Sequence, residues 1–247
     1  MTSELRILPA TGNFFLDCAI VDLSSLEDQL ESKIHLKKGD RLDIDSQMYF
    51  PVDMLISLSF DLREGYTAEF RQIGREGFAG FSAFMGNPAT GSSAVVQTSG
   101  SAYRVSASAM QDIFEMSPQF RKATLWYMQA LMQEAAQSII CNRYHSIIQQ
   151  YSRSLLLAFD RTGSESVHLT HEQIATTIGC RREAVSLVAR KLQNIDAIDY
   201  KYGRIAIVNR SILEANACEC YRVTRSAFSP LCAGRQTWDI IANDEGR

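Results

Sequence analysis

Five side chains in the C-terminal third of the chain could read the edges of DNA bases: Arg181, Arg182, Glu183, Ser186 and Leu187. Arginine can donate two hydrogen bonds to guanine O6 and N7, and glutamate can accept one from cytosine N4. An apolar side chain such as leucine can contact the methyl group of thymine. Each well-made bidentate pair distinguishes the right base from a wrong one by about 1–3 kcal/mol. This chemistry requires a helix that carries these residues into the major groove.

The stretch from Leu169 to Val208 has the pattern of a helix-turn-helix that could present them. Thr170 and Gln173 form a capping box, which marks the start of a first helix. Gly179 follows that helix and permits a sharp turn. Apolar residues recur at helical spacing and give each helix a buried face: Ile174, Ala175 and Ile178 in the first, and Val185, Val188, Ala189 and Leu192 in the second.

A hairpin and one more helix are predicted after this pair. Apolar residues alternate over 198–200 and 205–207 across Lys201-Tyr202-Gly203, which predicts a β-hairpin, or wing. Ser211 and Glu214 form a second capping box, which predicts a helix that runs to about Tyr221. The residues suited to DNA phosphates, because they are cationic or lie at a helix start, are Thr170, Arg190, Lys201 and Arg204.

An arginine–glutamate pair on a helix is most often only a solvated surface feature. Here Arg182 and Glu183 begin the second helix of a capped helix-turn-helix, and this position favours DNA binding. The charge distribution agrees: from Leu169 to Arg225 there are 9 Lys+Arg and 6 Asp+Glu, or +3, which leaves 16 and 22, or -6, elsewhere. A basic C-terminal unit on an acidic body suits a duplex-binding module joined to a regulatory domain.

The first 108 residues contain short β-prone runs separated by turns. The clearest runs are Arg41–Ile44, Met54–Phe60, Thr67–Ile73 and Ala94–Gln97. Short strands at near-regular spacing predict an antiparallel sandwich or roll. The first 30 residues favour a helical lead-in.

A long helix is predicted from Ser117-Pro118 to about Arg143, since proline suits the first helical position. Apolar residues at spacings of three and four draw a seam along one of its faces: Leu125, Met128, Met132, Ala135 and Ile139. Polar residues sit off that seam: Gln129, Gln133, Glu134 and Gln137. The seam could pack on its own domain or join two chains as a dimer helix. A further amphipathic helix over about Tyr144–Phe159 leads into a predicted turn at residues 160–163.

Ile174–Val188 (IATTIGCRREAVSLV) and the hairpin closely resemble the winged helix-turn-helix of the Crp-Fnr superfamily of bacterial transcription regulators. In that family an Arg-Glu pair at the start of the recognition helix reads bases, and Arg182-Glu183 occupy the matching positions. Met110–Cys141 is similar to the family's linker and dimer helix, and residues 217–221, Ala-Cys-Glu-Cys-Tyr, to one branch of the family. The positions similar to its β-roll are Tyr49-Phe50-Pro51, Gly65, Gly74, Gly77 and Gly80.

The resemblance implies an α+β fold with an N-terminal antiparallel β-roll, a dimerisation helix and a C-terminal winged helix-turn-helix. The corresponding bounds are 1–108 for the effector domain, 109–143 for the linker and dimer helix, 144–225 for the DNA-binding domain and 226–247 for a tail. The resemblance also implies a homodimer on a palindromic operator in double-stranded DNA, with the roll modulating DNA affinity. RNA polymerase is a further candidate partner.

Two departures from the family pattern matter. A further arginine usually follows four residues after the glutamate, and Leu187 stands at that position. Cyclic-nucleotide members have a glutamate and an arginine in their cassette, where this chain has Phe81 after Gly80 and Ser92 before Ser93. A buried phosphate without a cationic partner lacks the charge-assisted bonds that make such sites strong. Binding of a cyclic nucleotide in the usual way is therefore not expected.

The cysteines and histidines do not predict a metal or redox cofactor. Iron–sulfur members of the family use several N-terminal cysteines, whereas only Cys18 lies in that region of this chain. Cys218 and Cys220 fall on a predicted helix, where residues two apart point to different faces, so packing is favoured over a metal site or thiol sensor. A redox- or metal-responsive sensor stays as the alternative. Haem is not expected, because no ligand spacing is seen among His35, His145, His168 and His171.

The composition predicts a globular cytoplasmic protein, with 46% hydrophobic and 21% charged residues and a net charge of -3. No apolar run approaches the roughly 20 residues that span a bilayer, and no signal-peptide pattern opens the chain. Six cysteines in 247 residues do not suggest a disulfide framework. An enzyme of the cupin type is disfavoured, because its metal needs clustered histidines and only His35 lies in the N-terminal half. An interaction module with a vestigial DNA-binding unit is the other rival.

Overall fold

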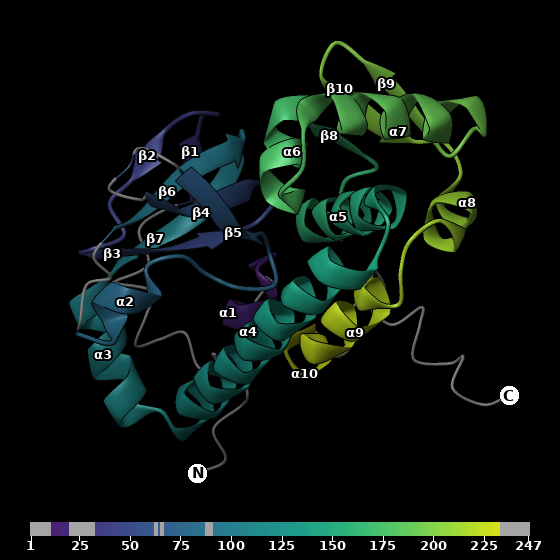
Figure 1. Ribbon diagram of the computed structural model, residues 1–247. Helices are drawn as coiled ribbons and strands as arrows, with labels where there is room; N and C mark the ends of the chain where they lie inside the picture. The colour runs from purple at the N-terminus through teal and green to yellow at the C-terminus, as the bar shows by residue number, and fades with distance from the viewer. Residues whose placement is uncertain (1–10, 20–32, 62–63, 65–66, 87–90, 233–247) are drawn as a thin grey trace, which may run out of the picture.

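The computed structural model describes residues 11–19, 33–61, 64, 67–86 and 91–232. An N-terminal β-roll and a C-terminal winged helix-turn-helix lie side by side, and the long helix α4 (Pro118–Tyr144) runs past both (Figure 1). The predicted α+β fold is therefore confirmed. None of the helices in the described ranges is long and apolar enough to cross a membrane.

The β-roll consists of two antiparallel sheets. One has the order β1 (Ile34–Leu36), β7 (Gly100–Ser106), β3 (Gln47–Pro51). The other has the order β2 (Arg41–Leu42), β6 (Ser92–Thr98), β4 (Leu55–Asp61), β5 (Thr67–Ile73). Each run named from the sequence overlaps a strand of this second sheet. The β-prone runs do not include β3, because four of its five residues are buried and the strand shows no alternation.

Two caps set the starts of the next helices. The Ser106 hydroxyl accepts from the Ala109 N–H at 3.3 Å and begins α3 (Ala107–Met116). The Ser117 hydroxyl accepts from the Phe120 N–H at 3.2 Å, and Pro118 takes the first position of α4. The helix start predicted at Ser117-Pro118 is therefore confirmed.

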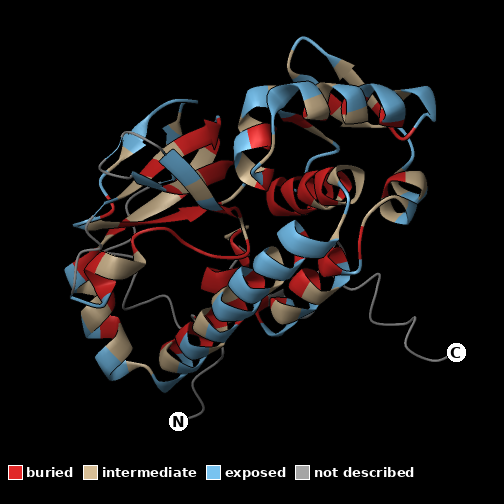
Figure 2. Cartoon of the chain, viewed as in Figure 1, coloured by how far each residue is buried: buried red, intermediate tan, exposed pale blue. Residues whose placement is uncertain are grey.

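Helix α4 has a buried face and an exposed face. Its buried face packs against α1 (Phe14–Ala19) and α9 (Cys220–Ala227) through residues such as Phe120 and Tyr127. The seam lies on the exposed face, with Leu125 66%, Met132 72% and Ile139 71% exposed (Figure 2). Ala135 is also exposed and Met128 is half-buried. Most of the seam is therefore left uncovered by the described part of its own chain.

Helix α5 (Ile147–Thr162) is longer than the sequence predicts. The expected turn at residues 160–163 is wrong, because Asp160, Arg161 and Thr162 complete the last turn of the helix and are buried. Gly163 alone leaves the helix, with φ of 68° in the left-handed region. These three polar residues, which predicted a turn, instead make buried hydrogen bonds and ion pairs.

The winged helix-turn-helix comprises α6 (His171–Ile178), α7 (Arg182–Asn194) and a three-stranded sheet. The sheet contains the predicted hairpin, β9 (Ile198–Lys201) and β10 (Arg204–Ile207). A third strand, β8 (Ser166–His168), pairs with β10 on its other edge. Three residues are too few for the alternation pattern to reveal this strand.

The C-terminal helices differ from the prediction. Asn209, and not Ser211, caps α8 (Arg210–Ala215), since its side-chain oxygen accepts from the Ile212 N–H at 3.1 Å. Glu214 bonds Arg210 instead of closing a capping box. The helix also ends at Ala215 and not near Tyr221, because α9 begins separately at Cys220.

Part of the segment expected to be a tail belongs to the fold. Phe228 is fully buried, with its ring centroid 6.2 Å from that of Tyr127. Helix α10 (Ser229–Cys232) follows it, and residues 233–247 lie outside the described ranges. Of the helical lead-in predicted over the first 30 residues, the described part contains the helix α1. Gly65, one of the positions similar to the family's β-roll, lies outside the described ranges.

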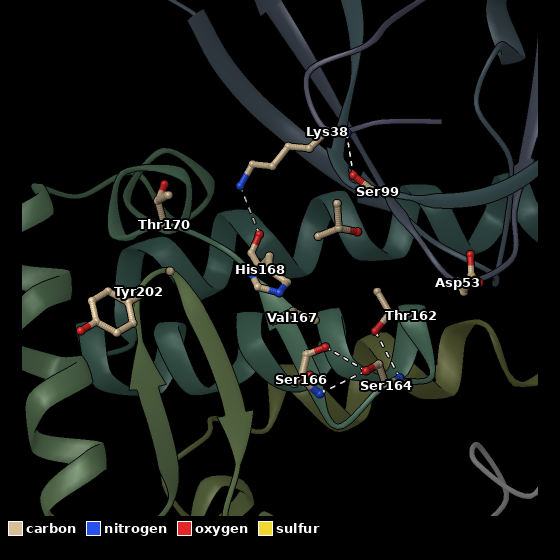
Figure 3. A pocket seen from close by; sticks show the side chains of 12 residues that line it. Lys38, Asp53, Ser99, Thr162, Ser164, Ser166, Val167, His168, Thr170 and Tyr202 are labelled. Carbon is tan, nitrogen blue, oxygen red and sulfur yellow. Dashed lines mark hydrogen bonds between the residues drawn. The ribbon is translucent and has the colours of Figure 1, made fainter. Parts of the chain in front are cut away.

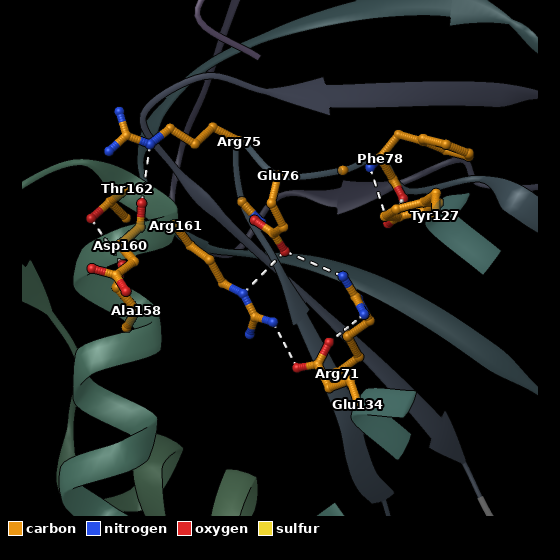
Figure 4. Close-up of polar contacts among 12 residues, drawn as sticks. Arg71, Arg75, Glu76, Phe78, Tyr127, Glu134, Ala158, Asp160, Arg161 and Thr162 are labelled. Carbon is orange, nitrogen blue, oxygen red and sulfur yellow. Dashed lines mark hydrogen bonds and ion pairs between the residues drawn. The ribbon is translucent and has the colours of Figure 1, made fainter. Parts of the chain in front are cut away.

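A buried group of four charged residues joins the roll, α4 and α5 (Figure 4). Glu134 of α4 bonds Arg71 of β5 and Arg161 of α5, the latter at 2.6 Å. Glu76 binds the same two arginines, at 3.2 Å from Arg71 and 3.0 Å from Arg161. Burial alone would raise the pKa of Glu134, but Arg161 and Arg71 outweigh it and lower the pKa to about 2.

The variant Glu134→Gln should lower the free energy of unfolding by about 3–5 kcal/mol, because it leaves two buried arginines with one carboxylate, that of Glu76, and hence a net buried positive charge. The wild-type contribution should be present above the ordinary glutamate pKa of 4.5 and lost as the pH falls towards 2, since the folded pKa is the lower one. Urea unfolding measured across pH checks both. The exposed Glu115→Gln is the matched control, and equal stability of the two variants would contradict the assignment.

Candidate nucleic-acid interface

Local bonds fix the turn between α6 and α7. The Thr170 hydroxyl accepts from the Gln173 N–H at 3.2 Å, and the Gln173 side chain accepts from the Thr170 N–H at 2.9 Å. Gly179 ends α6 with φ of 69°, where glycine carries no steric cost. The Cys180 N–H then donates to the Ala175 carbonyl at 3.0 Å. The capping box and the glycine turn predicted from the sequence are both confirmed.

The first turn of α7 faces solvent. Arg181 is the N-cap residue, and Arg181, Arg182 and Glu183 are exposed. Leu187 follows one turn later and is 67% exposed. The opposite face packs inward through Val185, Ala189 and Leu192, with Val188 half-buried. A helix anchored in this way can enter a groove without disturbing its packed face.

Ser186 differs from these neighbours because its hydroxyl is engaged within the domain. It donates to the Arg182 carbonyl at 3.1 Å and lies 2.9 Å from His171 Nδ1. The His171 ring stacks on Tyr200 with centroids 4.2 Å apart. Burial, and then the nearby charge of Arg182, lowers the pKa of His171 below its usual value. These contacts give Ser186 a place in the packing between α6, α7 and the wing.

The residues predicted to contact phosphates lie at the rim of this surface. Thr170 and Arg190 are exposed at the start of α6 and on α7. Lys201 pairs with Asp199 at 3.3 Å while its side chain stays 72% exposed. Arg204, also exposed, bonds Ser166 of β8 at 3.1 Å. The two wing cations are thus exposed to solvent on paired strands of the three-stranded sheet.

Two residues at this surface, Tyr202 and Lys38, were not predicted from the sequence to contact DNA. Tyr202 is fully exposed at the tip of the wing, with φ of 51°. Lys38 comes from the β-roll, and its Nζ donates to the His168 carbonyl at 3.3 Å and to Gln173 Oε1 at 3.1 Å (Figure 3). Both residues line a cavity of about 440 Å³ together with Thr170. The hairpin pattern marked the position of Tyr202, whereas no local signal places Lys38 beside α6.

Three of the four residues at the positions of the family's cyclic-nucleotide cassette lie around one cavity. Gly80, Phe81 and Ser92 line a mainly apolar cavity of about 200 Å³ between the roll and α4. Ser93 does not line it, and its hydroxyl lies 3.0 Å from that of Ser59. Among the described residues that line it, the charged one is Arg71, whose guanidinium is already bonded to two carboxylates.

Residues 152–215 match the family model of the Crp-like helix-turn-helix domain. This segment is similar to Crp-like helix-turn-helix domains. It spans most of α5, both helices of the motif, the wing and α8. No curated protein matches the chain.

About three quarters of the chain shares its fold with each of three solved structures, the first of which is a transcription regulator of the Crp/Fnr family. One from Thermus thermophilus is 20% identical with a TM-score of 0.59, over 75% of this chain and 98% of that one. FixK2 from Bradyrhizobium japonicum is 16% identical with a TM-score of 0.58, over 76% and 97%. The c-di-GMP-responsive regulator CLP of Xanthomonas campestris is 12% identical with a TM-score of 0.58, over 76% and 100%. At these identities the comparison establishes the fold alone.

The variant Arg182→Ala should weaken binding to an operator by about 1–3 kcal/mol and leave binding to random duplex nearly unchanged, because a base contact is lost. Lys201→Ala, its control, should weaken both alike and reduce the salt dependence by about one counterion. Fluorescence anisotropy with both duplexes at several salt concentrations separates the two effects. Equal losses on both duplexes for Arg182→Ala would contradict base reading by this residue.

Proposed function

We propose that this protein is a homodimeric, sequence-specific transcription regulator that binds a palindromic operator and whose β-roll modulates DNA affinity. The observation that carries the proposal is the exposed first turn of α7, where Arg181, Arg182 and Glu183 face solvent. Bidentate-capable side chains at the start of a recognition helix are suited to base edges in the major groove. We propose that the protein is a regulator and not an enzyme.

The exposed seam of α4 supports the dimer. Leu125, Met132 and Ile139 are each at least 66% exposed, and they repeat at coiled-coil spacing along one face. A second copy of the same helix offers a surface of the same pattern, as a two-fold interface requires. Two recognition helices related in this way would read half-sites about 34 Å apart, one turn of DNA.

Direct contacts between the roll and α6 support modulation of DNA affinity. Thr177 of α6 donates to Glu69 Oε1 at 2.5 Å, and Gln72 donates to the Thr177 hydroxyl at 3.1 Å. Lys38 reaches the start of the same helix. A shift of β5 or of the turn at Lys38 would therefore act on α6 without an intermediate element.

The cavity at the cassette favours an effector other than a cyclic nucleotide. Phe81 occupies the carboxylate position and Ser92 the arginine position of the binding members. Arg71 is held by Glu76 and Glu134, so a phosphate would have to break a buried ion pair to reach it.

Chromatin immunoprecipitation in the native host would supply the operator. With that operator, a substitution in the seam of α4 tests the proposed dimer. Met132→Asp should give monomers in sedimentation and abolish operator binding together, because a carboxylate would be buried at the seam. Gln133→Asp, exposed on another side of α4, should leave both properties intact. A Met132→Asp protein that remains dimeric would show that the interface lies elsewhere.

Cyclic AMP should produce no heat of binding in calorimetry and no change in operator affinity at millimolar concentration, since Arg71, the cation among the described residues that line the cavity, is already paired. Saturable binding to the wild type that is lost in Phe81→Trp would contradict this part of the proposal.

A further inference from the structure

Three cysteines and a histidine meet where the end of α4 faces the start of α9. They are Cys141, His145, Cys218 and Cys220, and their ligand atoms all lie within 4.8 Å of one another. The Cys141 and Cys218 sulfurs are 3.5 Å apart, and Cys220 Sγ lies 3.3 Å from His145 Nδ1. The three cysteines are buried and the histidine is half-buried.

Cys218 and Cys220 pack in one buried cluster with Cys141, but the prediction that they share a helix is wrong. Cys218 precedes α9, so its sulfur can turn towards the same point as that of Cys220. The histidines by themselves showed no ligand spacing in the sequence. Cys141 and His145 are four residues apart at the end of α4, a separation that brings side chains together on a helix.

Two of the separations, 3.5 Å between the Cys141 and Cys218 sulfurs and 3.3 Å between Cys220 Sγ and His145 Nδ1, are close to those of a tetrahedral zinc site, and the whole set lies within 4.8 Å. Zinc binds thiolate at about 2.3 Å and imidazole at about 2.0–2.1 Å, which at tetrahedral angles separates the ligand atoms by about 3.5–3.8 Å. A disulfide would need sulfurs about 2.05 Å apart. We propose that Cys141, His145, Cys218 and Cys220 bind one zinc ion as a Cys₃His site.

The surroundings suit a structural ion. All four ligands come from the protein, which closes the site, whereas catalytic zinc keeps a position open for water or substrate. Thiolate and imidazole ligands favour zinc over the hard cations magnesium and calcium. Gln137 donates to Cys220 Sγ at 3.0 Å and would orient this ligand. The cation of Arg153 lies close enough to Cys141 to offset part of the thiolate charge.

Such an ion would fasten both ends of the DNA-binding module to the dimer helix. His145 lies two residues before α5, and Cys218 follows α8, so the metal would join the two ends of the segment that contains α5 to α8. Tyr221 of α9 adds a bond to Asp160 of α5 at 2.7 Å. The effect on operator binding rests on the proposed function, but the site itself does not, because metal content is measured without DNA.

The test uses full-length protein, freed of any affinity tag and purified under reducing conditions without chelator. Elemental analysis should find about one zinc per chain in the wild type and in Cys180→Ser, a control cysteine outside the cluster. Cys220→Ser and His145→Ala should retain less than a tenth of it. Chelator should lower the melting temperature of the wild type and leave that of Cys220→Ser unchanged.

Cobalt gives a readout that does not depend on how the variants fold. Wild-type protein loaded with Co²⁺ should show the intense visible bands of a tetrahedral ion and thiolate-to-cobalt charge transfer. A reduced wild-type protein that binds neither zinc nor cobalt would overturn the proposal. So would zinc retained in full by both ligand variants, or a Cys141–Cys218 disulfide isolated in place of the metal.

Discussion

Glu134, near the middle of α4, lies buried between the guanidinium groups of Arg71 from the roll and Arg161 from α5. The charges belong to three separate parts of the chain, and Glu76 completes a set of two acids and two bases. Removing one member leaves the set with a net buried charge, which is far more costly than losing a surface pair. Movement of the roll relative to the DNA-binding module must therefore keep these bonds or exchange them for others.

This constraint gives α4 its two roles. One face of the helix carries Glu134 and Tyr127 into the chain's own interior, where Arg71 also lies over the Tyr127 ring at 5.5 Å. The other face leaves Met132 and its apolar neighbours exposed. In the proposed dimer, the helix that pairs the chains is thus also bonded to the roll, through Glu134 and Arg71. The cassette cavity borders the same arginine, so an occupant would act next to the ion pairs.

Sequence reasoning succeeded where structure is set by neighbours along the chain. The capping box at Thr170 and the left-handed turn at Gly179 depend on residues within one helical turn, so both could be predicted. It failed where partners are distant in sequence. Glu134 resembled a solvated position because its arginines lie far away along the chain. Asn209 gave no signal beyond its type, and Cys218 was misjudged because the helix boundary next to it was misplaced.

We propose that two copies of α7 read DNA from one two-fold assembly. Hydroxyl-radical footprinting of the full-length protein on an operator mapped in the native host tests it most directly. The claim predicts two protected half-sites of inverted sequence, centred about 10–10.5 base pairs apart on one face of the duplex. A single protected site, or protection without inverted symmetry, would contradict it.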